Sequence, residues 1–179
     1  MARLINYLSF YVIWIICLWS AVHDRQATAL IVTLTYLTLH LKLSKKPRFD
    51  LLLIASLTLL GLIQDTILIH TGIIVFHGNP PITPIWLLCI WALFGSTLDS
   101  SLFWLQKHPL LAALFGAFGF PICYQIGVSA TAATWLIPDP QAWLILALIW
   151  FFLFPALFYA LRFVEKRFGL GQTGKRSQS

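Results

Sequence analysis

Long apolar stretches separated by short polar breaks constrain this chain more than any other feature. A transmembrane helix needs about 20 consecutive, mostly apolar residues. Six stretches approach or reach that length: 4–22, 27–43, 51–72, 85–105, 110–130 and 142–161. With 59% hydrophobic and only 10% charged residues, the composition excludes an ordinary soluble domain. We therefore predict an all-α membrane protein, a compact bundle of six transmembrane helices within residues 1–163, followed by a basic, disordered tail at 164–179.

The distribution of Lys and Arg predicts the orientation. If six helices alternate in direction, eleven of the twelve basic residues fall on the side that carries both termini, and Arg25 alone falls on the other. Basic residues collect in cytoplasmic loops, so both termini are expected in the cytoplasm. The same distribution explains the net charge of +6 without nucleic acid as a partner. A cleaved N-terminal signal peptide is the alternative; the charge bias fits five or six helices equally, but a small-x-small cleavage site is missing.

One carboxyl group lies inside an apolar stretch. Asp65 follows Gln64 in the third predicted helix, and it shares one helix face with Thr58, Gly61 and Gly72. A central Asp costs roughly 3 kcal/mol on insertion scales, so this side chain is expected to face other helices. No Lys or Arg lies at the same depth, and low dielectric favours the uncharged acid. Asp65 is therefore predicted to be a neutral hydrogen-bond donor, a proton carrier or a ligand to a bound molecule.

Counting along the helices places two aromatic residues at the depth of Asp65. Trp91 and Tyr124 lie as many residues from the cytoplasmic end of their predicted helices as Asp65 does, and Gln64 and Gln125 adjoin this level. If the helix faces converge, these residues form a polar and aromatic pocket open to the outer side. Asp65 is then the candidate catalytic residue, and the candidate ligand-binding residues are Gln64, Trp91, Tyr124 and Gln125. The alternative is that these residues only pack helices together.

The polar residues near the cytoplasmic side have a simpler interpretation. Asp99 lies close to the predicted interface, where a salt bridge with Lys107 or with the basic second loop is expected. A basic rim on this side is expected to contact lipid headgroups through His40, Lys42, Lys45, Lys46, Arg48 and His108.

Neither the histidines nor the cysteines form a metal-binding pattern. His23, His70 and His77 lie toward the outer end, but no pair has the i, i+4 spacing of a helical metal motif, so no metal site is predicted. The cysteines are Cys17, Cys89 and Cys123; each stands alone in an apolar stretch, which predicts buried apolar packing.

Four segments resemble, in sequence and order, a bacterial inner-membrane family known as domain of unknown function 2878. They are "HLKLSKKPRFDLLLI", "GLIQD", "PIWLLCIWALFGSTLDSSLFWL" and "HPLLAALFGAFGFPICY". The resemblance covers nearly the whole chain up to residue 161. It implies a multi-pass protein of the bacterial inner membrane, and the genomic neighbourhood of family members implies a link to membrane lipids. It supplies no functional residues.

These observations lead to three functional hypotheses. The preferred one is a protein that binds or helps modify a membrane lipid or another apolar molecule, with no cofactor and with enzymatic activity left open. The second is a small proton-coupled transporter in which Asp65 exchanges protons. The third is a scaffold or assembly partner without a site of its own. The expected partners are membrane lipids, a second copy of the chain or another membrane protein.

Overall fold

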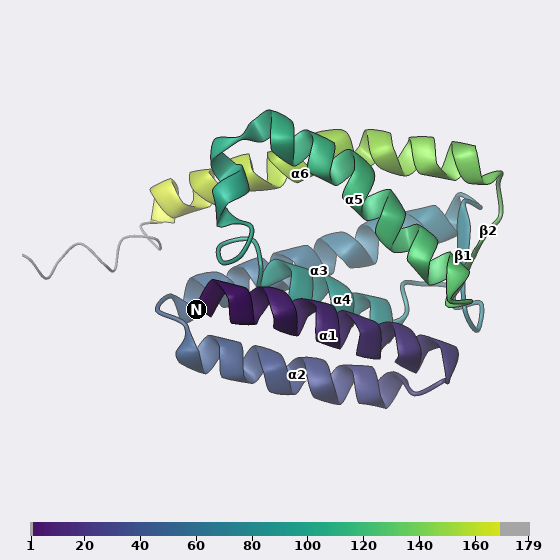
Figure 1. The fold of residues 1–179 in the computed structure, drawn as a ribbon, viewed down its shortest axis with the longest axis horizontal. Helices are drawn as coiled ribbons and strands as arrows, with labels where there is room; N and C mark the ends of the chain where they lie inside the picture. Colours follow the sequence, from purple (N-terminus) through teal and green to yellow (C-terminus); the bar gives the residue numbers. More distant parts are fainter. Residues whose placement is uncertain (1, 169–179) are drawn as a thin grey trace, which may run out of the picture.

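In the part of the chain that the structure describes, the fold is all-helical apart from one short pair of strands (Figure 1). This computed structural model describes residues 2–168. Within that range the elements are α1 (Ala2–Val22), α2 (Gln26–Leu43), α3 (Pro47–His70), β1 (Ile74–Phe76), α4 (Ile85–Gly95), the 3-10 helix η1 (Phe103–Lys107), α5 (Pro109–Ser129), β2 (Ala133–Trp135) and α6 (Asp139–Phe168). Four of the six α-helices, α1, α3, α5 and α6, are long and apolar enough to cross a membrane by length and composition.

The helices run back and forth between two ends of the molecule (Figure 1). One end holds the start of α1, the loop 44–46 and the end of α6, and we call it the N-terminal end. The other end holds the turn 23–25 and the antiparallel pair of β1 and β2, in which Val75 lies opposite Thr134. We call it the strand end. The helices form two parts, a layer of α1 to α4 and a hairpin of α5 and α6.

Helix α4 lies at the centre of the molecule. It packs against α1, α2 and α3, and its Trp91 and Phe94 rings contact aromatic rings of the α5–α6 hairpin. Its buried residues are Trp86, Leu87, Cys89, Trp91, Ala92, Leu93, Phe94 and Gly95. A helix that is apolar on all sides is expected in the interior, and α4 fulfils this expectation.

The fourth helix is shorter than the sequence predicts. The stretch 85–105 was expected to be one continuous helix, but α4 ends at Gly95 and the chain continues through turns to η1. The hydroxyl groups of Ser96 and Thr97 donate to the carbonyl oxygens of Leu93 and Phe94, each at 2.7 Å, and so compete with continuation of the helix. Because residues 96–98 are buried, this irregular backbone is shielded by protein.

The sixth helix is longer than expected. Residues 164–168 continue α6 to Phe168, so the prediction of a disordered tail from residue 164 is wrong for this part. The rest of the predicted tail, 169–179, lies outside the described residues.

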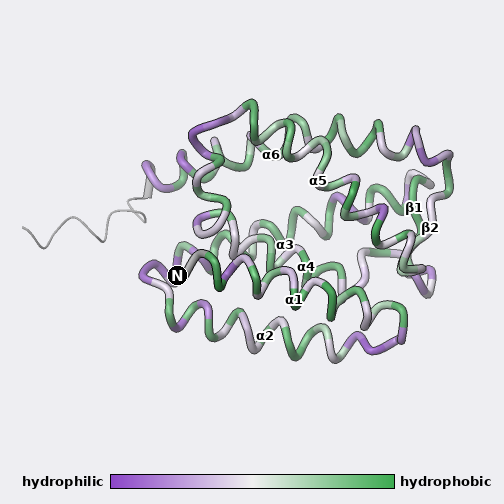
Figure 2. The backbone as a smooth tube through the Cα atoms, viewed as in Figure 1, coloured by the Kyte–Doolittle hydropathy of each residue, from purple (hydrophilic) through white to green (hydrophobic). Residues whose placement is uncertain are grey.

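The outward faces of the helices are apolar, whereas hydrophilic residues gather mostly at the two ends (Figure 2). Large exposed hydrophobic residues include Leu8, Ile15, Leu59, Ile63, Phe118, Leu144, Leu148 and Phe152. Water-exposed apolar patches of this extent are rare on soluble proteins. The surface therefore fits contact with lipid chains along the helices and with water at the ends.

Candidate functional site

Three helices bring polar groups together around Asp65. Its side chain is fully buried on α3, and its Oδ2 accepts a hydrogen bond of 2.7 Å from Trp91 Nε1 on α4. The hydroxyl of Tyr124 on α5 donates to Asp65 Oδ1, and Gln64 Nε2 donates to the Tyr124 oxygen at 3.1 Å. These four residues, which the sequence placed at or next to a common depth, thus lie together, and the condition that their helix faces converge is met. Their roles in catalysis or ligand binding stay predictions.

Gly61 is the residue that lets Trp91 approach α3. It lies one helical turn before Asp65, on the same face. A Cβ atom built on Gly61 would lie only 2.1 Å from the nearest Trp91 ring atom, so any side chain there would collide with the ring. The indole ring of Trp91 therefore packs against Gly61 on this helix face, and its N–H points to the carboxyl group of Asp65.

Asp65 itself lines none of the three cavities described below. Both of its oxygens accept hydrogen bonds, and the side chain has no exposed surface. The Trp91 and Tyr124 side chains engage both carboxyl oxygens, so Asp65 faces these two rings and not a polar pocket. In this arrangement Asp65 fixes the positions of two aromatic rings.

Gln125 does not join this cluster. Its Oε1 accepts hydrogen bonds from Trp135 Nε1 at 3.0 Å and from Trp143 Nε1 at 2.9 Å. It therefore connects α5 to β2 and α6 at the strand end. The predicted grouping of Gln125 with Asp65 is wrong.

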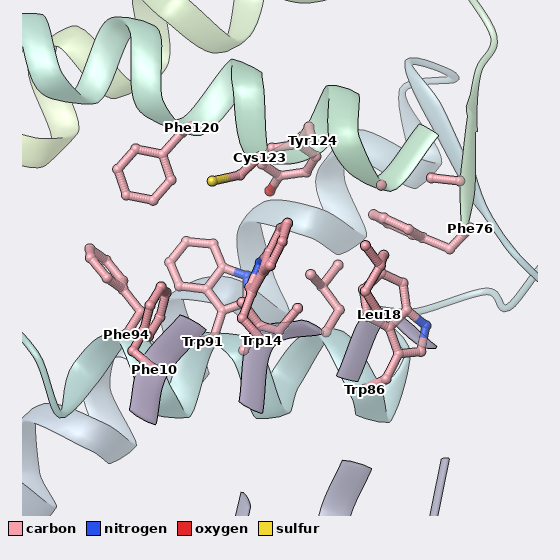
Figure 3. A pocket seen from close by; sticks show the side chains of 14 residues that line it. Phe10, Trp14, Leu18, Phe76, Trp86, Trp91, Phe94, Phe120, Cys123 and Tyr124 are labelled. Atoms are coloured by element: carbon pink, nitrogen blue, oxygen red, sulfur yellow. The ribbon is translucent and has the colours of Figure 1, made fainter. Parts of the chain in front are cut away.

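An apolar cavity of about 90 Å³ lies next to the Asp65 cluster (Figure 3). Trp91 and Tyr124 form part of its wall, together with residues of α1 and of the strand end. The full lining is Phe10, Trp14, Leu18, Phe76, Trp86, Leu87, Ile90, Trp91, Phe94, Phe120, Cys123, Tyr124, Gly127 and Ala133. The sequence suggested a polar and aromatic pocket at this depth, whereas the cavity in the structure is apolar and mostly aromatic.

A second apolar cavity, of about 270 Å³, adjoins the first. The two share Phe10, Trp14, Phe94, Phe120 and Cys123, and the second extends past Tyr7 toward the N-terminal end. Together they form a groove between α1, α4 and α5, which we call the aromatic groove. An apolar cavity of about 150 Å³ accepts a benzene-sized guest, so the groove has room for a larger apolar group.

Stacked rings support the wall of the groove from behind. Phe120 of α5 stacks on Trp150 of α6 with 3.3 Å between ring centroids, and Trp150 stacks in turn on Trp91 at 5.5 Å. Trp150 has no exposed surface. Because Trp91 is held by Gly61, Asp65 and Trp150 together, this part of the wall is formed before any ligand arrives.

Sequence reasoning missed several residues of the groove. Cys123 was expected to be a buried packing residue, but it is exposed, and its sulfur points into the cavity (Figure 3). Cys17 and Cys89 are buried, as predicted. The sequence spacing could have indicated that these residues of α5 line one wall, because residues 120, 123 or 124, and 127 share one face of a helix.

The predicted headgroup-contact residues fall into two sets. His40, Lys45 and Lys46 line a third, polar cavity at the N-terminal end, whereas Lys42, Arg48 and His108 are exposed outside it. Contact of either set with lipid headgroups stays a prediction.

Lys46 and Asp99 form the predicted salt bridge between the second loop and the segment after α4. Lys46 Nζ lies 3.3 Å from Asp99 and 3.2 Å from Glu165 of α6. Burial alone would lower the pKa of Lys46, but attraction to Asp99 and Glu165 outweighs it, and the pKa is raised. The ammonium group thus ties the loop 44–46 to two other parts of the chain.

The apolar outward faces and the four long apolar helices define a multi-helix membrane protein. The chain belongs to the family described as "Protein of unknown function (DUF2878)", whose model matches residues 3–156. The match includes α1 to α5 and the first part of α6, and with them all residues of the Asp65 cluster and the aromatic groove. No curated protein and no solved structure matches the chain.

Proposed function

We propose that this is a bacterial inner-membrane protein with six membrane-crossing segments and with both termini in the cytoplasm. The N-terminal end carries the loop 44–46 and the basic end of α6, which supports a cytoplasmic position for it. Helix α2 has 18 residues and lies alongside α1, so it covers the same depth. The segment 85–107 crosses as α4 followed by buried turns and η1.

Reporter fusions test this topology. Alkaline phosphatase, which is active only outside the cytoplasm, is inserted in the loop at Gly78 or fused after Ser179. Activity is expected at Gly78 and not at Ser179. The reverse pattern, or the same pattern at both positions, would refute the proposed orientation.

The function proposed for the aromatic groove is to bind an apolar molecule, such as the acyl chain of a membrane lipid. The observation that carries this proposal is the pair of adjoining cavities walled by Phe10, Trp14, Phe94 and Phe120. Ligand pockets are typically apolar with large aromatic contributions and are largely formed in advance. A ligand chain would replace the missing contacts of these rings and gain dispersion energy.

Asp65 acts in this proposal as a positioning residue. It holds the Trp91 indole and the Tyr124 ring through their donor groups, and it does not line the groove itself. A ligand would touch the faces of these rings without touching the carboxyl group. Substitution of Asp65 is therefore expected to weaken ligand binding through displaced rings.

Cys123 provides a direct test because its thiol lies on the wall of the groove. The purified protein is stripped of lipid in detergent, and its alkylation by N-ethylmaleimide is followed with increasing amounts of oleate. Oleate is expected to slow alkylation of Cys123. Because Cys17 and Cys89 are buried, they do not contribute to the signal in the folded protein.

A cavity-filling variant sharpens this test. Gly127 lines the first cavity, and a Cβ atom there would meet no atom within 4 Å, so Gly127→Leu fills space without a collision at its Cβ. It is expected to keep the unfolding temperature and to reduce the protection by oleate. Trp19→Leu is the matched control, since Trp19 is 49% exposed and outside the groove.

Each outcome decides between the functional hypotheses. Protection that is lost in Gly127→Leu and kept in Trp19→Leu supports a groove for an apolar chain. Alkylation that oleate leaves unchanged refutes it. Proton flux in liposomes that requires Asp65 would then favour the transporter hypothesis, and copurification of a stoichiometric protein would favour the scaffold hypothesis.

A further inference from the structure

The third cavity lies at the N-terminal end, on the other side of α1 from the aromatic groove. It has a volume of about 590 Å³, within the usual range of ligand pockets. Its walls come from the first turns of α1, the last turns of α2, the loop 44–46, the start of α3 and the segment after α4. We call it the polar cavity. Its position and lining are independent of the proposed function of the aromatic groove.

The polar cavity has a hydrogen-bonded floor. Asn6 is only 5% exposed, and its Nδ2 donates to the Tyr36 hydroxyl at 2.7 Å. The Ser101 hydroxyl donates to Asn6 Oδ1 and so ties α1 to the segment after α4. Asn6 and Tyr36 both line the cavity, which therefore has a defined polar base between α1 and α2.

Basic and acidic side chains both line its walls, and some of their donor and acceptor atoms have no hydrogen-bond partner among the described residues. Lys45 is exposed and forms no ion pair with the described residues. His40 Nε2 is buried without a hydrogen-bond partner, although it lies 3.5 Å from Asp50 Oδ2. Asp50 and Asp99 use Oδ2 for their protein contacts, which leaves the Oδ1 atom of each available within the described part of the chain.

The mouth of the polar cavity is apolar. Ile5 is 59% exposed, Leu39 is 54% exposed and Leu43 is 84% exposed, and all three line the cavity. A ligand that reaches the polar interior past these residues would have an apolar part beside them. This combination favours a lipid headgroup over a wholly polar solute.

We propose that the polar cavity binds a headgroup that carries both a phosphate diester and an ammonium group. A simple anion would meet the carboxylates of Asp50 and Asp99, and a simple cation would meet Lys45 and Lys46. A zwitterion satisfies both signs. Its phosphate lies against the exposed ammonium group of Lys45, with the His40 ring in the adjoining wall, and its ammonium group donates to the free carboxylate oxygens of Asp50 and Asp99.

Matched lipids test this specificity. The full-length protein in maltoside detergent is stripped of lipid and titrated with dioleoyl-phosphatidylethanolamine or dioleoyl-phosphatidylglycerol, and bound lipid is counted by native mass spectrometry. The two lipids share their chains and their phosphate, and only the first has an ammonium group. One phosphatidylethanolamine is expected to bind at least about tenfold more tightly, the effect of one charge-assisted hydrogen bond. Equal binding of the two lipids would overturn the proposal.

Variants locate the binding site. Lys45→Gln combined with His40→Gln is expected to weaken phosphatidylethanolamine binding about tenfold or more. Lys42→Gln is the matched control, because Lys42 is an exposed lysine near the end of α2 that does not line the cavity. An equal loss in the control would overturn the proposal in favour of unspecific attraction. The unfolding temperature of each variant, and binding by Lys45→Gln alone, separate lost binding from lost folding.

A soluble headgroup distinguishes the source of the ligand. Glycerophosphoethanolamine has the same phosphate and ammonium groups without acyl chains. Weak competition with the lipid supports a membrane ligand held partly by Ile5, Leu39 and Leu43. Competition as strong as that of the whole lipid supports the headgroup chemistry with a soluble ligand, and no competition even at saturating concentration refutes recognition of the headgroup.

Discussion

Gly61→Ala is expected to destabilise the protein strongly, although it adds only one methyl group. The new Cβ atom would lie 2.1 to 2.3 Å from three atoms of the Trp91 ring. Carbon atoms prefer separations of about 3.5 to 4.0 Å, so the ring has to move by roughly 1.4 Å. Trp150 stacks on the ring and limits this movement. The hydrogen bond of 2.7 Å from Trp91 to Asp65 would then be lost.

The expected magnitude follows from these losses. Overpacking costs about 1 to 3 kcal/mol, and a buried acceptor that loses its donor costs about 1 to 3 kcal/mol more. The higher helix propensity of Ala returns about 1 kcal/mol. The free energy of unfolding should therefore fall by about 1 to 5 kcal/mol. The assay is the temperature at which the detergent-purified protein loses its folded peak in size-exclusion chromatography after heating.

Two further variants show whether the reasoning is right. Gly119→Ala is the matched control, since its Cβ would come no closer than 3.7 Å to the Phe115 ring, and it should leave stability unchanged or slightly raised. Trp91→Leu removes the colliding ring, so the loss in the double variant with Gly61→Ala should be smaller than the sum of the single losses. The reasoning is refuted if Gly61→Ala behaves like Gly119→Ala, or if the two losses simply add.

Three other predictions concern single groups. Tyr124→Phe removes the hydroxyl that donates to Asp65 and should lower the free energy of unfolding by about 1 to 3 kcal/mol, measured by thermal unfolding against Tyr159→Phe, whose ring is 59% exposed. Lys46→Met should lower the unfolding temperature at neutral pH. Folding raises the pKa of Lys46, so the stability that its ion pairs contribute is complete below the unfolded-state pKa and is lost as the pH rises through the folded-state pKa. The unfolding temperatures of parent and variant should therefore converge in strong alkali. N-ethylmaleimide should modify Cys123 alone in the folded protein and all three cysteines in dodecyl sulfate; rapid modification of a Cys123→Ser variant before denaturation would contradict the burial of the other two.

The broad architecture could be predicted because it follows from length and hydropathy. The six apolar stretches correspond to six helices, and the inward position of Asp65 follows from the cost of exposing a carboxyl group to lipid. The sequence placed Trp91 and Tyr124 at the depth of Asp65, because helical rise converts residue number into position along the helix axis, but it left open whether their helix faces converge.

Other features depended on packing that residue counts do not contain. Gln125 follows Tyr124 directly, but one residue turns the helix by about 100°, so the two side chains point in different directions. The sequence does not reveal that α4 ends at Gly95. Residues 96–98 are shielded by neighbouring elements, so their backbone does not have to be helical at that depth. The aromatic groove arises between α1, α4 and α5, and its existence depends on how these helices are placed.

The pairing of β1 with β2 joins two segments that are synthesised at different times. The ribosome delivers β1 directly after α3, whereas β2 follows only when α4 and α5 have been made. Until α5 has been made, Asp65 lacks Tyr124, and until α6 follows, the aromatic face of α4 has no complete hairpin to pack against. The first four helices are therefore synthesised before the helices that pack against them, α5 and α6. Pairing of Phe76 with Ala133 closes a long loop, and it connects the layer of α1 to α4 with the hairpin of α5 and α6.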